Sequence, residues 1–150
     1  MILEDINFPY YDFLFKKYKN KLYIMDIIRN KYVICNKEEW VRQNLIHYMI
    51  KEKKCNIFAM KVEKTININN QLKKLDLIIY NDNRQVWLIA ECKNNIKKID
   101  EYVFYQIKSY NIQCKAKYIL ITNGLNHYCC KSNFLKNQYQ FLKEIPFYNQ

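Results

Sequence analysis

Two short apolar runs, Leu75–Tyr80 and Val86–Cys92, limit most strongly what this chain can fold into. Both are rich in β-branched and aliphatic residues, and the polar segment 81–84 lies between them, which is typical of two strands joined by a turn. A third strand pattern, over residues 57–68, precedes them. The three segments predict an antiparallel meander.

Helical patterns are found on both sides of this meander. Asn36 can cap a helix over residues 37–53, with Glu39 at the position that a reciprocal capping box requires. A second helix is expected over 100–110. The apolar run 118–122 predicts a fourth strand, which ends at the turn signal Asn123-Gly124 and leads to a short segment through residue 131.

The first 35 residues are expected to form a β extension. Aromatic, aliphatic and lysine residues alternate between residues 13 and 25, with a polar turn at 19–21, and this predicts a hairpin. One Gly, two Pro and no low-complexity stretch argue against a linker, so one continuous domain is expected, with the extension 1–35 packed on a core of residues 36–150.

Cysteine spacing and hydropathy point to an intracellular chain. Six cysteines occur without a CxxC pair or a zinc-ligand spacing, so reduced core thiols are expected. No run approaches the roughly 18 apolar residues of a membrane span, and the N-terminus lacks the pattern of a signal peptide. These features predict a cytoplasmic protein without a membrane partner.

The chain is strongly basic, with 25 Lys and Arg against 14 Asp and Glu, a formal charge of +11. Such a charge is typical of nucleic-acid-binding domains. However, the same chain is rich in Asn, Ile and Tyr, which share AT-rich codons with Lys. Charge alone therefore leaves a polyanion-binding surface and a solvated lysine surface equally open.

Residues suited to catalysis lie at one end of the predicted meander. Asp76 begins one strand, and Glu91-Cys92-Lys93 ends the next. Side chains alternate between the faces of a strand, so Glu91 and Lys93 project to the same side and Cys92 to the other. With a two- or four-residue loop, the numbers of paired residues have an odd sum and Asp76 lies opposite or diagonal to Glu91. An odd-length loop would separate them.

This arrangement predicts a Mg²⁺ site, with Mn²⁺ as an alternative ion. Asp76 and Glu91 supply hard oxygen ligands, and the backbone carbonyl of Cys92 is a candidate third ligand. Lys93 would stabilise negative charge that develops on a phosphate or, with a lowered pKa, would help to deprotonate the nucleophile. Alone, each residue is as easily explained as a surface ion pair or a turn residue, but the combined spacing favours a site.

The chain resembles the N-terminal nuclease domain of type I restriction enzyme R subunits, in a small stand-alone form, and through it the PD-(D/E)XK nuclease superfamily. The similarity extends from about residue 23 to residue 131. It is carried by five segments: Lys37–Gln43, Lys74–Tyr80, Leu88–Lys93, Gln106–Asn111 and Ile121–Gly124. The resemblance implies an α/β fold with a restriction-endonuclease-like core, formed by a helix, three antiparallel strands, a helix and a strand.

The resemblance also implies roles for helix residues. A glutamate of the first helix would assist the metal, and Glu39 is a better candidate than Glu38. Gln106 and Tyr110 would share one face of the second helix, where they would contact the phosphate backbone or orient Lys93. Tyr110 is also readily explained as a core tyrosine.

Two basic residues are candidate nucleic-acid contacts. Lys74 stands where the family commonly has arginine, which weakens any bidentate grip on phosphate. Arg42 would reach phosphate, although a salt bridge to Glu38 explains it equally well.

The resemblance favours a Mg²⁺-dependent DNA endonuclease or exonuclease. The sequence contains no P-loop motif, so any motor would come from a partner subunit in trans. Two alternatives stay open: a non-catalytic nucleic-acid-binding or assembly module with the same fold, and an RNA-processing nuclease. A homodimer is also open.

Overall fold

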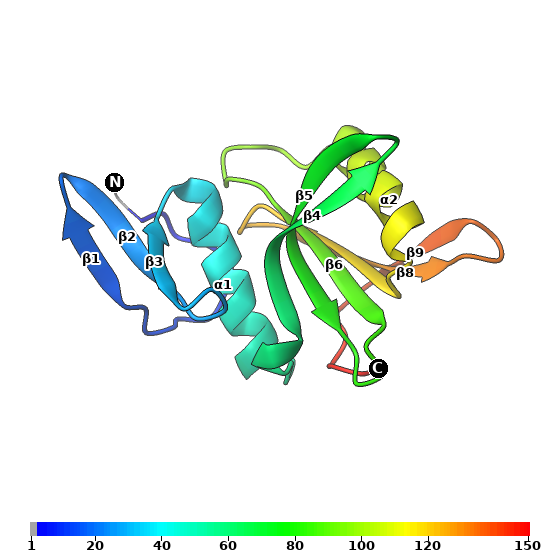
Figure 1. Ribbon diagram of the computed structural model, residues 1–150, viewed down its shortest axis with the longest axis horizontal. Helices are drawn as coiled ribbons and strands as arrows, with labels where there is room; N and C mark the ends of the chain where they lie inside the picture. Colours follow the sequence, from blue (N-terminus) through cyan, green and yellow to red (C-terminus); the bar gives the residue numbers. More distant parts are fainter. Residues whose placement is uncertain (1–2) are drawn as a thin grey trace.

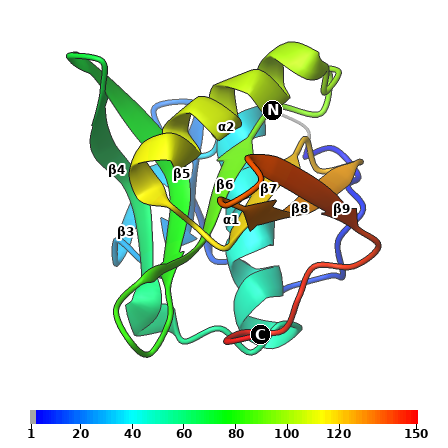
Figure 2. The ribbon, with the colours of Figure 1, turned by 90° about the vertical axis from the view of Figure 1, so that its right-hand side faces the viewer.

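The computed structural model describes residues 3–150 as four stacked layers (Figure 1). A three-stranded sheet covers one side of helix α1, a six-stranded sheet covers the other side, and helix α2 lies on the far face of the larger sheet. Figure 2 shows the two helices on opposite faces of that sheet. The chain is therefore a mixed α/β protein with two sheets and two α-helices among the described residues.

The elements follow one another along the chain with short connections. The first sheet contains β1 (Phe15–Tyr18), β2 (Lys21–Asp26) and β3 (Lys31–Ile34). Helix α1 (Lys37–Lys51) and a short 3-10 turn, η1 (Ile57–Ala59), come next. The second sheet and its helix comprise β4 (Met60–Ile68), β5 (Gln71–Tyr80), β6 (Val86–Cys92), α2 (Glu101–Cys114), β7 (Tyr118–Thr122), β8 (His127–Asn133) and β9 (Gln138–Leu142).

The larger sheet keeps its strands in sequence order, β4-β5-β6-β7-β8-β9. All neighbouring strands are antiparallel except β6 and β7, which are parallel. A parallel pair requires a long crossover, and α2 supplies it. The predicted meander and the strand 118–122 are observed, and β5 extends further toward its N-terminus than the sequence pattern indicated.

The β5–β6 connection contains a compensating irregularity. The loop spans residues 81–85, an odd length that was expected to place Asp76 and Glu91 on different faces. That expectation is wrong because β6 contains a bulge. Ile79 pairs with Leu88 and Tyr80 pairs with Val86, so Trp87 is an extra residue that shifts the register by one. Beyond this bulge the paired residue numbers again have an odd sum, so the two carboxylates face the same way.

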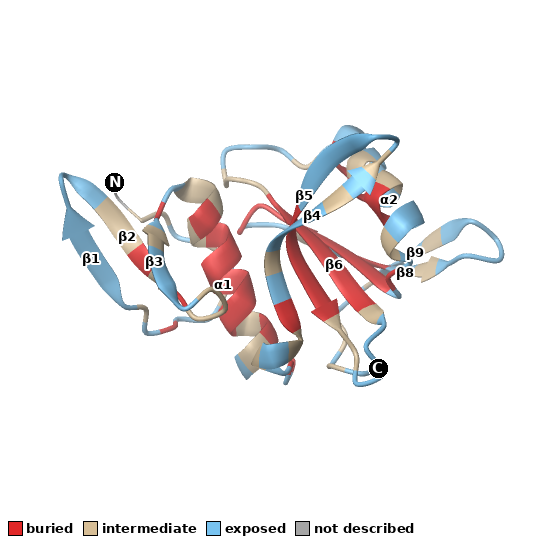
Figure 3. Ribbon diagram, in the orientation of Figure 1, coloured by how far each residue is buried: buried red, intermediate tan, exposed pale blue. Residues whose placement is uncertain are grey.

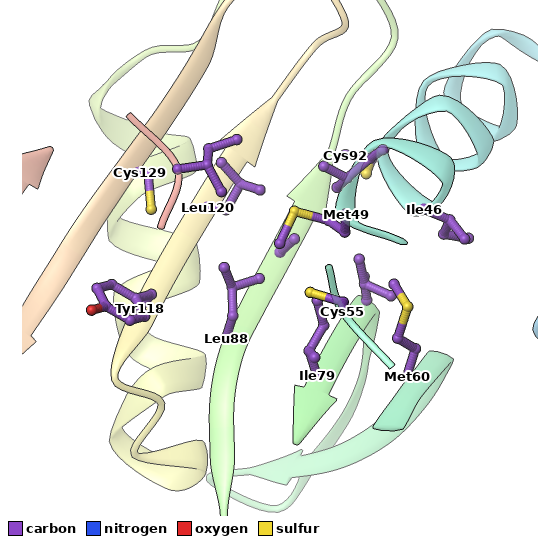
Figure 4. Close-up of a cluster of buried hydrophobic side chains, with 14 of the residues drawn as sticks. Ile46, Met49, Cys55, Met60, Ile79, Leu88, Cys92, Tyr118, Leu120 and Cys129 are labelled. Atoms are coloured by element: carbon purple, nitrogen blue, oxygen red, sulfur yellow. The ribbon is translucent and has the colours of Figure 1, made fainter. Parts of the chain in front are cut away.

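Two apolar cores lie on opposite faces of the six-stranded sheet. Between the sheet and α1, fully buried side chains such as Met49 and Leu88 pack together, and Figure 4 shows them with Cys92, Ile79 and Leu120. A second core packs α2 on the other face. Each fully buried aliphatic side chain contributes about 1.5–3 kcal/mol relative to an exposed one, so these cores hold the central strands in place.

Helix α1 is buried on most of its circumference because it has a sheet on either side (Figure 3). Phe13 and Phe15 of the N-terminal segment pack against Trp40, with their ring centroids 5.0 and 6.2 Å from that of Trp40. At its start, Oδ1 of Asn36 accepts the N–H of Glu39 at 2.8 Å. Only this half of the predicted capping box forms, because the Glu39 carboxylate accepts bonds from arginine side chains instead.

Three strands were not predicted from the sequence. The N-terminal hairpin is observed, but β3 adds a third strand to it. Strands β8 and β9 extend the larger sheet where only a short segment was expected. All six cysteines are free thiols, and five of them are buried. Neither helix in residues 3–150 is long and apolar enough to cross a membrane.

Candidate active site

Asp76 and Glu91 lie opposite each other on the central strands β5 and β6. The register pairs Leu77 with Ala90, and one further step along each strand brings Asp76 opposite Glu91. Both residues are buried, with 8% and 7% of their surfaces exposed. The sheet thus holds two carboxylates side by side at the edge of its apolar core.

Asp76 is held by donors from two directions. Its Oδ1 accepts a hydrogen bond from Nη2 of Arg42 at 2.7 Å, and its Oδ2 accepts the backbone N–H of Cys92 at 2.7 Å. The first donor comes from α1 and the second from β6. The carboxylate is therefore fixed in one orientation before any ligand binds.

Glu91 has an unusual environment for a carboxylate. Burial and the negative charge of Asp76 raise its pKa to about 7, although the hydrogen bond and the charge of Lys93 act in the opposite direction. Its Oε1 accepts a bond from Nζ of Lys93 at 2.8 Å. Its Oε2 is buried and has no hydrogen-bond partner in the described part of the chain.

Lys93, the first residue after β6, brings a second positive charge to the carboxylate pair, in addition to that of Arg42 in α1. Burial alone would lower its pKa, but the hydrogen bond and the charge of Glu91 outweigh burial and raise it. A lysine with a raised pKa is protonated at neutral pH. A protonated ammonium can stabilise negative charge but cannot accept a proton.

Arg42 lies inside the protein rather than on its surface, with 6% of its side chain exposed. Besides Asp76, its guanidinium pairs with Glu39 at 2.9 Å, with Glu63 at 3.5 Å and, more distantly, with Glu38 at 3.9 Å. In this arrangement it faces carboxylates and is not available to a phosphate. The salt bridge to Glu38 that the sequence suggested is the weakest of its four contacts.

The two glutamates at the start of α1 are placed differently. Glu39 is buried and holds Arg29 and Arg42. Glu38 is half-exposed, and burial and the charge of Asp76 raise its pKa. The charge of Lys93 also acts on Glu38. Glu39 thus touches the site through Arg42, and Glu38 is a second candidate for direct contact with a bound cation.

Gln106 and Tyr110 occupy one face of α2, as their spacing predicted. Nε2 of Gln106 donates to the Tyr110 hydroxyl at 2.8 Å. Burial raises the pKa of Tyr110, and the charges of Glu91 and Asp76 act in the same direction. The residue is also 5% exposed and belongs to the core under α2, as expected of a core tyrosine.

Lys74 lies on β5 two residues before Asp76 and is exposed to solvent. It stands opposite Thr65 of β4.

The residues present fit a divalent cation, although they do not make a complete protein cage. Among the described residues, no group of three or more His, Cys, Asp or Glu side chains is arranged to hold a metal ion. Mg²⁺ commonly binds through only one or two carboxylates and keeps several waters. A cation between the two carboxylates would give the buried Oε2 of Glu91 a partner and would relieve their mutual repulsion. The Cys92 thiol is not a ligand candidate, because burial raises its pKa well above 9.

Arg29 is a site residue that sequence reasoning missed. It lies between β2 and β3, pairs with Asp26 at 2.6 Å, and reaches across to Glu39 and Glu63. It thereby ties the N-terminal sheet to the network that holds Asp76. No local pattern signals this contact, because its partners lie 10 and 34 residues away.

Comparison with solved structures finds a related fold. A fragment from Vibrio vulnificus YJ016, described as an HsdR subunit of a type I restriction enzyme, aligns with a TM-score of 0.55 at 17% sequence identity. The alignment covers 75% of this chain and 24% of that chain. This likeness supports the fold. Comparison with curated proteins finds no match.

A family model of the type I restriction enzyme R protein N terminus (HSDR_N) matches residues 37–146. The matched region begins at α1 and includes the whole six-stranded sheet and α2. It contains every predicted site residue. The chain belongs to the family of type I restriction enzyme R protein N-terminal domains.

Proposed function

We propose that this chain is a Mg²⁺-dependent phosphodiesterase of the PD-(D/E)XK type that hydrolyses DNA. The observation that carries the proposal is the facing pair Asp76 and Glu91, with Lys93 bonded to Glu91 at 2.8 Å. Membership of the restriction R-protein family and the basic surface of the chain support it.

In this proposal Asp76 and Glu91 hold Mg²⁺, with the backbone carbonyl of Cys92 as a further ligand and Mn²⁺ as a substitute ion. The ion would supply an activated water and neutralise charge on the scissile phosphate. Arg42 and the Cys92 N–H hold Asp76 in place, so its carboxylate needs little rearrangement. Glu38 and Glu39 are the helix glutamates that assist, Glu38 directly and Glu39 through Arg42.

Lys93 would stabilise the negative charge that develops on the phosphate during attack. Its ammonium is protonated and lies 2.8 Å from Glu91, which places it beside the proposed ion. Tyr110 and Gln106 of α2 would orient the phosphate backbone. Lys74, exposed on β5, would contact the same strand of nucleic acid.

The relation to R subunits suggests that this chain works with partner subunits. The similar fragment is described as part of a type I restriction enzyme, and this chain spans about a quarter of its length. A motor subunit supplied in trans is therefore part of the proposal, and the proposed partners are DNA and that subunit.

One observation favours a second function, a non-catalytic nucleic-acid-binding module. Arg42 already neutralises Asp76, and such an ion pair replaces part of what a cation would do. If Mg²⁺ cannot displace Arg42 from Asp76, the site would bind nucleic acid without cutting it.

A nuclease assay separates the two functions. Purified wild-type chain is incubated with single-stranded DNA, double-stranded DNA and RNA in Mg²⁺ or Mn²⁺, beside Lys93→Ala and the exposed control Lys98→Ala. The nuclease proposal predicts cleavage of DNA by wild type and Lys98→Ala, and loss of at least about 100-fold in Lys93→Ala. If the wild type cleaves none of these substrates, the nuclease proposal is rejected and the non-catalytic binding module takes its place. Preferential cleavage of RNA would make the chain an RNA-processing nuclease.

A further inference from the structure

The N-terminal sheet has one covered face and one open face. Alternation along the strands directs Ile24, which is fully buried, toward α1 together with Phe15, its cross-strand partner. The opposite side chains form the outer face: Lys16, Tyr18, Lys21, Tyr23, Met25, Tyr32 and Ile34. No element within residues 3–150 covers this outer face (Figure 3).

Large rings on the outer face are open to solvent. Tyr18 is 55% exposed and Tyr32 is 38% exposed, and Ile34, two residues after Tyr32 on β3, is 49% exposed. The pairing register places Lys16, Tyr23 and Ile34 in one row across the three strands. A small sheet with apolar and aromatic side chains on an uncovered face is a typical interaction surface.

The charge of this surface has one sign. Lys16 and Lys21 are exposed on the outer face and Lys19 is exposed in the β1–β2 turn. Lys16 and Lys19 approach the rings of Tyr32 and Tyr18 at 6.0 and 5.3 Å. The one carboxylate between residues 13 and 36, Asp26, is fully buried and paired with Arg29. A polyanion would therefore meet no repulsion on this face.

The interleaving of rings and lysines identifies the kind of partner. Cores of protein interfaces are depleted of lysine, which argues against a protein or a second copy of this chain. Single-stranded nucleic acids are bound by aromatic rings that stack on bases and by cations that track the phosphates. A duplex keeps the faces of its bases stacked and cannot use the rings in this way.

We propose that the outer face binds single-stranded DNA, with the bases stacked on Tyr18 and Tyr32 and the phosphates against Lys16 and Lys21. The choice of DNA over RNA rests on the proposed function. The sheet has room for about two or three stacked bases. Arg29, which joins this sheet to Glu39 and Glu63, places the β2–β3 turn beside the candidate active site.

Binding of a labelled oligothymidylate of about 12 nucleotides, followed by fluorescence anisotropy in EDTA, tests the proposal without cleavage. Tyr18→Ala/Tyr32→Ala should weaken binding by about tenfold or more, because each stacked ring is lost. Tyr18→Phe/Tyr32→Phe should bind as wild type does, since stacking uses the ring and not the hydroxyl. Tyr105→Ala, a 73% exposed tyrosine on α2, is the control and should leave binding unchanged.

Salt dependence gives a second readout. Replacing Lys16 and Lys21 together by Ala should reduce the log-log slope of affinity against salt by about 0.7 for each phosphate that the chain no longer neutralises. Lys136→Ala, in the exposed β8–β9 turn, should leave the slope unchanged.

Three results would overturn the proposal: wild-type affinity in the double alanine variant, equal loss in the phenylalanine variant, or tighter binding of an oligouridylate than of the oligothymidylate. Lys98→Ala, an exposed lysine to which no role is assigned, is measured alongside and should bind the oligothymidylate normally. If the wild-type chain binds DNA but does not cut it, the proposed nuclease activity is rejected and the proposed binding of single-stranded DNA to the outer face is kept. If the wild-type chain cuts DNA and the double alanine variant binds as wild type does, binding at the outer face is rejected and the nuclease activity is kept.

Discussion

Arg42 donates to Asp76 across the interface between α1 and β5, at 2.7 Å and almost out of contact with solvent. The same guanidinium holds Glu39, the helix residue whose backbone is capped by Asn36. The start of the helix and the centre of the sheet are thus joined through one arginine. This arrangement holds a carboxylate in place for a cation and also couples the stability of the fold to the proposed site.

Replacing Arg42 with Met should destabilise the chain by about 3–5 kcal/mol, because it leaves Asp76 buried without its counter-charge and leaves Glu39 paired with Arg29 alone. The free energy of unfolding in urea measures the loss. Arg84→Met is the matched control: Arg84 is exposed in the β5–β6 turn, and its replacement should change stability by no more than about 0.5 kcal/mol. A loss below about 1 kcal/mol in Arg42→Met would contradict the importance of the pair.

Replacing Asp76 with Asn should remove most of the stabilisation that Mg²⁺ gives. A ligand that binds only the folded state raises the melting temperature, so the shift between EDTA and Mg²⁺ reports metal binding independently of catalysis. The variant should also lose about 1–3 kcal/mol without metal, because Asn has only one acceptor oxygen for Arg42 and the Cys92 N–H. Asp82→Asn, in an exposed turn, should keep the wild-type Mg²⁺ shift; an equal shift in Asp76→Asn would exclude Asp76 as a ligand.

The central elements could be predicted because their signals are local. Strands β6 and β7 are continuous apolar runs, and α1 carries its cap residue directly before an apolar stripe. Strands β3 and β9 lack such signals because each is mostly exposed and lies at the edge of its sheet. Their polar and aromatic sequences are compatible with loops as well as with strands.

The candidate site was predictable in its pairing but not in its network. Alternation along β6 places Glu91 and Lys93 together, and this follows from spacing alone. The bulge at Trp87 could not be foreseen, yet it decides whether Asp76 faces them. The hydrogen bond from Arg42 to Asp76 joins residues 34 positions apart, and only the packing of α1 on the sheet brings them together.

Replacing Gly124 with Ala should destabilise the fold by about 1–3 kcal/mol, because φ is +88° in the turn after β7, a conformation that L residues rarely adopt. An added Cβ would also lie 2.9 Å from Cγ2 of Ile6 and 3.1 Å from Cγ2 of Val41. Thermal unfolding measures the loss. Ile6→Ala is then added to both wild type and Gly124→Ala. The loss of stability caused by Gly124→Ala should be smaller in the Ile6→Ala background, because the shorter side chain leaves room for the added Cβ. Equal losses in the two backgrounds would show that the backbone conformation alone is responsible.

The unfolding free energy of the metal-free chain should fall as pH rises from about 4.5 to about 7. Burial and the charge of Asp76 raise the pKa of Glu91 from 4.5 to about 7, so in this range the folded chain keeps a proton that the unfolded chain has released. The loss attributable to Glu91 is at most about 3 kcal/mol. Glu91→Gln should remove this component, and the exposed control Glu101→Gln should keep it. Because Mg²⁺ favours the ionised carboxylate, the stabilisation that it gives the wild type should grow over the same pH range. A pH profile of Glu91→Gln that matches the wild type in EDTA would show that Glu91 titrates as an ordinary surface carboxylate, and the strongest support for a cation between it and Asp76 would be lost.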